Sequence, residues 1–337
     1  MTALQMKRRH FLLTCLAMIS STRVASAQSR SFRIAFANLN EEAGARIDGL
    51  GFTGADVRRS FELASRGLPV DMIYYDNGGD AEKALGNAKD AVASKVDLLI
   101  EYNSDARANA EIGRQLKAAG IPLLAVNYSI PGAPLYTADN SGAGRIAGRA
   151  LGKFAKENWP DQPLVAAILG DVSDPNAAVA ARIQGITEGL RQEMPDLSPV
   201  QLDSTGQPVR AGSVLSKFLM AQTRRKVLVA TLDDASALAA KSAVETAGRI
   251  SDCVIVSQGA DRSIHGGASE KKEIDPANRG SIVLGSVAYY LDRYGYEILP
   301  IALRMLRGEQ VASQTSTKHV LISAKNVFVE YPPYDMN

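Results

Sequence analysis

Short apolar runs typical of β-strands alternate with longer helical stretches along most of the chain, and this alternation constrains the fold most. Candidate strands occupy residues 33–37, 70–75, 96–102, 121–126, 164–169, 227–231, 253–256 and 281–287. Candidate helices occupy residues 81–94, 106–119, 142–157, 177–193, 235–247 and 290–306. Apolar strands joined by helices predict parallel sheets that helices cover on both faces. The expected class is α/β, with two doubly wound parallel-sheet lobes.

Several helix boundaries are visible in the sequence itself. Gly120 ends one helical pattern, and a strand pattern begins directly after it. Asp139 precedes the small-residue run 141–148, which predicts an N-cap followed by a closely packed helix. Asp233 and Asp234 precede the helical stretch 235–247 in the same way.

The first 27 residues have the layout of an export signal. Basic residues at positions 7–9 precede a short apolar run at 11–19, and Ala25-Ser26-Ala27 supplies a small-residue cleavage pattern. The apolar run is about half the length that a bilayer-spanning helix needs. Residues 8–12 read Arg-Arg-His-Phe-Leu and resemble the twin-arginine export motif, with an ordinary Sec signal as the alternative. We expect cleavage near Ala27 and a periplasmic mature protein.

The signal carries the positive charge of the chain. It holds four basic and no acidic residues, so its removal takes the formal net charge from +2 to −2. A nucleic-acid partner, which requires clustered cations, is therefore not expected. The mature chain keeps one cysteine, Cys253, in an apolar run, which predicts a buried thiol and no internal disulfide.

Polar side chains gather where the predicted strands end. Asn38, Asn103, Asn127, Tyr128, Asp233 and Gln258 all lie at or just beyond such ends, as do Tyr102 and Asp171. Ligands of open α/β sheets bind beyond the carboxyl ends of the strands. Amides, carboxylates and phenols with few cations suit a neutral polyhydroxyl ligand. The alternative is that such residues are helix caps and turns, which we prefer for Asp139 and Asp234.

Six short stretches recur in a characteristic order and spacing, at residues 76–82, 96–100, 119–124, 136–140, 181–185 and 321–327. Taken together, they resemble periplasmic sugar-binding proteins of the ribose-binding type. The similarity runs from about Phe32 to Val329. A signal peptide stands where related repressors carry a DNA-binding header, so a repressor is not expected.

The resemblance implies two lobes joined by a three-crossing hinge, with the ligand between them. It places the crossings near Ala138, Tyr289 and Lys318. The N-terminal lobe would comprise residues 31–138 and 290–318, and the C-terminal lobe residues 139–289 and 319–337. By position, Asn127 and Tyr128 match a pair that holds sugar hydroxyls, and Arg182 and Gln184 flank the position of a ligand-binding arginine. Asp233 matches a ligand-binding asparagine, and Tyr289 matches a glutamine at the crossing. Gly259 replaces a ligand-binding aspartate.

The segment after the first strand differs most from the ribose binders. Residues 38–53 form a longer loop, in which Phe52 is the aromatic available to stack on a sugar face. Glu41, Glu42 and Asp48 offer acceptors for hydroxyl groups or an amine. These differences predict a ligand other than ribose.

An exported nicotinamide-dependent oxidoreductase is the alternative function. Gly49, Gly51 and Gly54 fit G-x-G-x-x-G, and Asp76 follows the next strand, where a ribose-binding acid would stand. Against this, the glycines begin eleven residues after Asn38, whereas a dinucleotide fingerprint turns directly off its strand.

Taken together, the sequence predicts a solute-binding protein and no enzyme. We expect a sugar, polyol or similar small polar ligand, an ABC permease or a membrane sensor as partner, and a monomer. The chain has three histidines, one of them in the signal, and no Cys/His spacing that suits zinc, so neither a metal nor a cofactor is expected.

Overall fold

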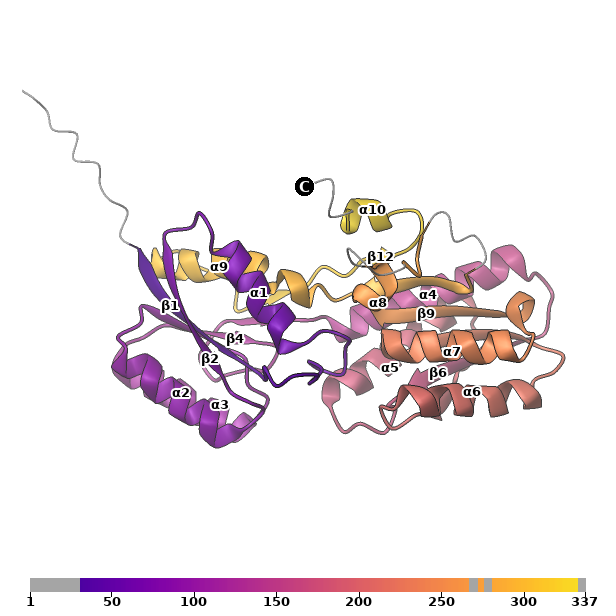
Figure 1. The fold of residues 1–337 in the computed structure, drawn as a ribbon, viewed down its shortest axis with the longest axis horizontal. Coiled ribbons are helices and arrows are strands. Elements are labelled where there is room, and N and C mark those ends of the chain that lie inside the picture. Colours follow the sequence, from indigo (N-terminus) through magenta and orange to yellow (C-terminus); the bar gives the residue numbers. More distant parts are fainter. Residues whose placement is uncertain (1–30, 267–271, 276–280, 333–337) are drawn as a thin grey trace, which may run out of the picture. The chain divides into compact units, whose positions relative to one another are not determined.

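The computed structural model describes residues 31–266, 272–275 and 281–332, which form two parallel-dominated sheets flanked by helices (Figure 1). The predicted export signal lies outside these residues. The predicted α/β class with two doubly wound sheets is confirmed. Within the described ranges, no helix combines the length and apolar character that a membrane span requires.

The first sheet is parallel throughout, in the order β11-β5-β4-β3-β1-β2. Ile34 and Phe36 face a core that includes Phe61, whereas Ala35 and Ala37 face the opposite core. Both faces of β1 are therefore buried, as its apolar sequence predicts. The elements are β1 (Phe32–Asn38), α1 (Gly54–Ala64), β2 (Val70–Asp76), α2 (Ala81–Ala93), β3 (Leu98–Glu101), α3 (Ala106–Ala119), β4 (Leu123–Val126), β5 (Leu135–Thr137), α9 (Tyr294–Leu306) and β11 (Gln314–Ser316).

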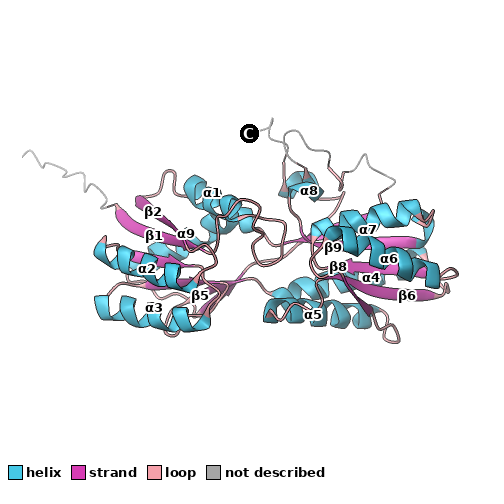
Figure 2. Cartoon of the chain, turned by 60° about the horizontal axis from the view of Figure 1, so that its bottom comes forward, coloured by secondary structure: helices cyan, strands magenta, loops and turns pink. Residues whose placement is uncertain are grey.

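The second sheet has the order β12-β10-β9-β8-β6-β7, and only the β10–β12 pair is antiparallel. Helices cover both of its faces (Figure 2). Cys253 lies buried in this core as a free thiol, as predicted. The elements are α4 (Asn140–Asn158), β6 (Leu164–Gly170), α5 (Ala177–Glu193), β7 (Val200–Asp203), α6 (Pro208–Ala221), β8 (Lys226–Thr231), α7 (Asp234–Thr246), η1 (Ile250–Asp252), β9 (Cys253–Gly259), α8 (Arg262–His265), β10 (Val283–Ala288), η2 (Leu291–Arg293), β12 (Leu321–Ile322) and α10 (Val327–Glu330).

The chain passes between the two sheets three times. It leaves the first sheet after β5, returns after β10 towards α9, and leaves again between β11 and β12. Because β5, β11 and β12 have only two or three residues, their sequences carry too little pattern to identify them as strands. The lobe bounds given above remain predictions.

Helices α4 and α5 pack closely through glycines on both sides. A Cβ atom on Gly148 of α4 would lie 2.6 Å from the backbone nitrogen of Leu190 and closer still to the carbonyl oxygen of Ile186. Gly144 meets the carbonyl oxygen of Arg182 in the same way. The predicted cap is also present, because Asp139 Oδ1 accepts a hydrogen bond from Gly142 N at 2.8 Å. This packing fixes the position of α5, which carries Arg182.

Candidate functional site

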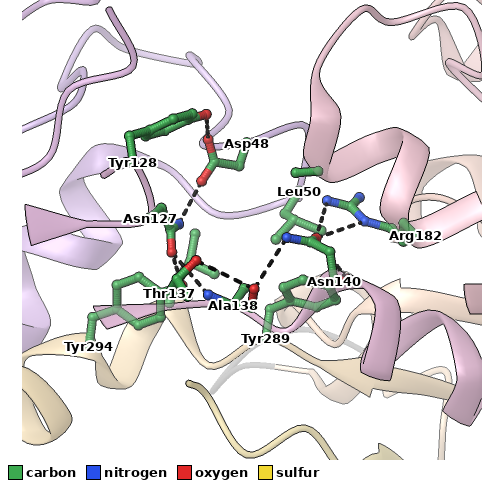
Figure 3. A pocket seen from close by; sticks show the side chains of 12 residues that line it. Asp48, Leu50, Asn127, Tyr128, Thr137, Ala138, Asn140, Arg182, Tyr289 and Tyr294 are labelled. Carbon is green, nitrogen blue, oxygen red and sulfur yellow. Dashed lines mark hydrogen bonds between the residues drawn. The ribbon is translucent and has the colours of Figure 1, made fainter. Parts of the chain in front are cut away.

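A small polar pocket lies between residues of the two sheets, near the ends of their strands (Figure 3). Its cavity volume is about 30 Å³, which is room for one or two water molecules. The lining consists mainly of amides, phenols, one carboxylate and one guanidinium. The lining residues are Asp48, Leu50, Asn127, Tyr128, Thr137, Ala138, Asn140, Ala178, Arg182, Tyr289, Leu291 and Tyr294.

The carboxylate reaches the pocket on a hairpin formed by residues 46–53, here called the Asp48 hairpin. Arg46 pairs with Thr53 in an antiparallel bridge, and Leu50 N donates to Ile47 O at 2.9 Å. Asp48 and Gly49 at the tip have φ values of 52° and 71°. Positive φ at both central residues is the geometry of a type I′ turn, for which Asp-Gly is a preferred sequence.

The stem of the hairpin is part of the protein core. Ile47, Leu50 and Phe52 are all buried and pack in the same cluster as Phe36 of β1. The stem also contacts Asp261, which follows β9 of the second sheet. A Cβ atom on Gly51 would overlap the carboxylate of Asp261. The insertion predicted from residues 38–53 is therefore an ordered, packed element and not a loose loop.

Three donors from the first sheet hold the Asp48 carboxylate. Its Oδ2 accepts from the Tyr102 hydroxyl at 2.5 Å and from Asn127 Nδ2 at 2.7 Å. Its Oδ1 accepts from the Tyr128 hydroxyl at 2.5 Å. Tyr102 directly follows β3, whereas Asn127 and Tyr128 directly follow β4. Burial, and next the charge of Asp48, raise the pKa of both phenols, so both remain protonated donors.

Arg182 is the buried cation of the pocket, with 1% of its surface exposed. Its Nε and Nη2 donate to Asn140 Oδ1 at 3.3 and 3.1 Å, and Nη1 donates to Leu232 O at 3.0 Å. The guanidinium carbon lies 5.1 Å from the ring centroid of Tyr289. Among the residues with described positions, no carboxylate oxygen lies within 4.0 Å of this guanidinium. The guanidinium therefore contacts neutral oxygens and an aromatic ring.

Tyr289 is a buried lining residue of the pocket. Its hydroxyl donates to Gln258 Oε1 at 2.8 Å, and Asn140 Oδ1, 3.3 Å away, is the alternative acceptor for the same hydrogen. Burial raises the pKa of Tyr289 to about 12, so the phenol stays neutral. The hydroxyl oxygen can still accept a hydrogen bond from a ligand.

The pocket brings together five of the residues singled out in the sequence: Asp48, Asn127, Tyr128, Arg182 and Tyr289. Gln258 does not line the pocket but accepts a hydrogen bond from Tyr289, which does. Their roles towards a ligand remain predictions.

Three other predicted residues are engaged in local structure outside the pocket lining. The Asn38 side chain donates to Gly54 O at 2.9 Å and to Glu41 Oε1 at 3.0 Å, which ties the base of the insertion to β1. Asn103 donates to Asn109 Oδ1 on α3 at 2.9 Å. Asp233 caps α7 through Ser236, with N–H and hydroxyl donors at 2.8 and 2.7 Å.

Phe52 and Gln184 are also absent from the pocket lining. Phe52 is only 3% exposed and packs in the core beneath the hairpin, so its ring does not face this pocket. Gln184 is directed along the outer side of α5, where its Nε2 donates to Glu188 Oε1 at 2.7 Å. The i, i+2 spacing from Arg182 turns Gln184 away from its neighbour on a helix.

Sequence reasoning missed several lining residues. Thr137, Asn140 and Tyr294 lie beside the crossings. Thr137 ends β5, a strand too short to be recognised in the sequence, and residues 136–140 matched the family without being singled out as ligand-binding. Asp48 was expected to accept hydrogen bonds from a ligand but accepts them from the protein itself. The Asp48-Gly49 dipeptide is the signal that could have indicated the hairpin.

The dinucleotide interpretation of Gly49, Gly51 and Gly54 is wrong. The first two glycines lie in the hairpin, and Gly54 packs against the backbone oxygen of Asn40. The N-terminus of α1 is already occupied by a capping box in which Asp56 accepts from Thr53 N at 2.9 Å. A carboxylate there would repel a pyrophosphate.

A family model described as "Periplasmic binding protein domain" matches residues 52–310, about three quarters of the chain. The chain belongs to the periplasmic binding protein family. This assignment confirms the resemblance seen in the sequence and supports a solute-binding protein over an oxidoreductase. The family is a class of extracytoplasmic solute-binding proteins. A search of curated proteins finds no match.

Solved structures of such proteins share the fold. GanP, a glucose-galactose binding protein from Geobacillus stearothermophilus, is 19% identical with a TM-score of 0.62, over 88% of this chain and 99% of GanP. A solute-binding protein from Actinobacillus succinogenes with bound D-allose is 15% identical, with a TM-score of 0.66 and coverages of 88% and 99%. One from Bacillus halodurans with bound myo-inositol is 17% identical, with a TM-score of 0.65 and coverages of 91% and 99%.

Proposed function

We propose that the protein captures a small polar solute, such as a sugar or a polyol, in the pocket between its two lobes. The observation that carries this proposal is the convergence of Asn127 and Tyr128 from one lobe with Arg182 and Tyr289 from the other. A ligand that bridges both sets favours the closed state through its differential affinity. The bound sugars and polyols in the structural relatives support the same ligand class.

The rest of the proposal concerns the setting of this binding event. Residues 1–27 would direct export to the periplasm, with the signal cleaved near Ala27 and the twin arginines as the preferred route. The mature protein would be a monomer without catalytic activity. It would present its closed form to an ABC permease or a membrane sensor, in line with its family.

A thermal-shift screen with D-allose, D-galactose, myo-inositol and small organic acids, and with aromatic compounds and charged amino acids for comparison, tests the proposal. Small-angle scattering with the best compound should give a smaller radius of gyration than the protein alone. An unchanged radius contradicts hinge closure, and a screen in which only aromatic compounds or charged amino acids stabilise the protein contradicts the ligand class.

A matched pair of variants tests the pocket. Tyr289→Phe removes one buried hydroxyl from the lining, and Tyr296→Phe removes one from a half-exposed ring on α9. We expect Tyr289→Phe to weaken binding by about 2- to 10-fold, the value of one hydrogen bond, and Tyr296→Phe to leave it unchanged. Equal affinities for the two variants would place the ligand elsewhere.

A further inference from the structure

The pocket already holds a carboxylate, and that carboxylate belongs to the chain itself. Asp48 takes three hydrogen bonds from Tyr102, Asn127 and Tyr128, all between 2.5 and 2.7 Å. Hydrogen bonds with an ionised acceptor are short and strong. The donors at the ends of β3 and β4 are therefore arranged for a carboxylate, as Figure 3 shows for Asn127 and Tyr128.

The charge of Arg182 supplies a second, independent observation. A guanidinium has five N–H bonds, of which three serve Asn140 and Leu232, and a further hydrogen bond from Arg182 acts on the phenol of Tyr289. Burying a cation without a nearby anion is costly. Asp48 is the one carboxylate among the described residues that line this pocket together with Arg182.

The cavity is too small for a sugar or a polyol while Asp48 stays in place, because it measures about 30 Å³. Ligand binding therefore requires the lobes to separate, and replacement of the Asp48 carboxylate on its three donors requires the tip of the Asp48 hairpin to move. Asp48 is only half-buried and Gly49 is exposed, whereas Ile47, Leu50 and Phe52 anchor the stem in the core. Rotation of the tip leaves these apolar contacts in place, so the tip can move without unfolding the stem.

We propose that the solute bound here is a hydroxylated carboxylate, whose carboxylate group replaces that of Asp48 on Tyr102, Asn127 and Tyr128. A neutral ligand would displace Asp48 and leave the three donors without an anion. A ligand carboxylate supplies that anion again, and the hydroxyl groups of the ligand can face the guanidinium of Arg182 and the hydroxyl oxygen of Tyr289. The inference rests on the proposed function and narrows its ligand class.

Three pairs of compounds that differ by a carboxylate in place of a hydroxymethyl group test the inference on the unmodified protein. The pairs are glycerate with glycerol, gluconate with sorbitol, and galacturonate with galactose. We expect at least one acid to bind at least about tenfold more tightly than its neutral partner in calorimetric titration, a difference of about 1.4 kcal/mol. Equal or tighter binding of the neutral partner in every pair would overturn the inference.

Asp48→Asn tests the competition between the hairpin and the ligand. The variant keeps the size of the side chain but removes its charge, so the acid should bind at least about tenfold more tightly than to the wild type. Glu42→Gln, an exposed carboxylate in the same insertion, is the control and should leave affinity unchanged. Weaker acid binding by Asp48→Asn would overturn the inference, and should this variant not fold, the three pairs decide it.

The outcomes separate this inference from the function on which it rests. If galactose, sorbitol or glycerol binds and closes the lobes while the acids do not bind, the inference fails and the proposed function stands. If none of the six compounds binds to the wild type or to Asp48→Asn, the inference fails, and the broader screen decides the function. An acid that binds without reducing the radius of gyration retains the ligand class and contradicts closure.

Discussion

Helices α4 and α5 give the strongest test of the packing that positions Arg182. Gly148→Ala adds one methyl group to the face of α4 that touches α5. That methyl carbon would lie 2.6 Å from Leu190 N, about 1 Å inside the normal separation of such atoms. The helices must therefore move apart or bend. Overpacking of this kind costs about 1–3 kcal/mol.

The same substitution elsewhere should have the opposite effect. Gly86 lies in α2, and a Cβ on it would have no atom within 4 Å. Gly86→Ala should stabilise the protein by about 1 kcal/mol, the difference in helix propensity between the two residues. Gly148→Ala gains the same amount from propensity, so its net effect is a loss of up to about 2 kcal/mol.

Urea unfolding of the three proteins measures the difference, which we expect to reach about 3 kcal/mol between the two variants. The wild type should lie between them. If Gly148→Ala were as stable as Gly86→Ala, the close approach of α4 and α5 would not be the reason for glycine at position 148. Scattering or crystallography could then show whether α5 had moved.

Two further predictions concern buried titratable groups. Burial raises the pKa of Glu101 from 4.5 to about 8. The folded protein therefore holds the Glu101 proton more tightly than the unfolded chain, and the resulting stabilisation is fully present below about pH 4.5 and is lost as the pH rises to about 8. Glu101→Gln should reduce the decline of the unfolding free energy with pH by up to about 1.4 kcal/mol per pH unit, as measured by denaturant unfolding. An unchanged decline would contradict a protonated Glu101. Burial also raises the pKa of Cys253 to about 12, so iodoacetamide should alkylate this thiol only as the protein unfolds, and rapid labelling of native protein, followed by mass spectrometry, would contradict its burial.

Some site positions followed from strand ends alone. Asn127 and Tyr128 come directly after β4, and the carboxyl ends of neighbouring parallel strands meet at one edge of a sheet. The same rule also pointed to Asn38, Asn103 and Asp233, which hold turns and helix caps outside the pocket lining. Amides and carboxylates satisfy backbone donors as readily as ligands, so sequence position cannot separate the two uses.

The hairpin shows the opposite case. Asp48-Gly49 between apolar residues is a turn signal that can be recognised in the sequence. Where the tip lies depends on Ile47, Leu50 and Phe52 packing against residues distant in the chain. The three glycines at positions 49, 51 and 54 were open to a nucleotide interpretation until these contacts were known.

The sequence by itself determined the α/β class, the two sheets and the family, because strand and helix periodicity and short matched stretches are local properties of the chain. Only the tertiary structure decided that Asp48 occupies a pocket that the buried Arg182 also lines. The donors on Asp48 are 54 to 80 residues away from it in the chain. Contacts of that range form only when the whole domain folds, and they set the charge of the pocket and with it the ligand class that we propose.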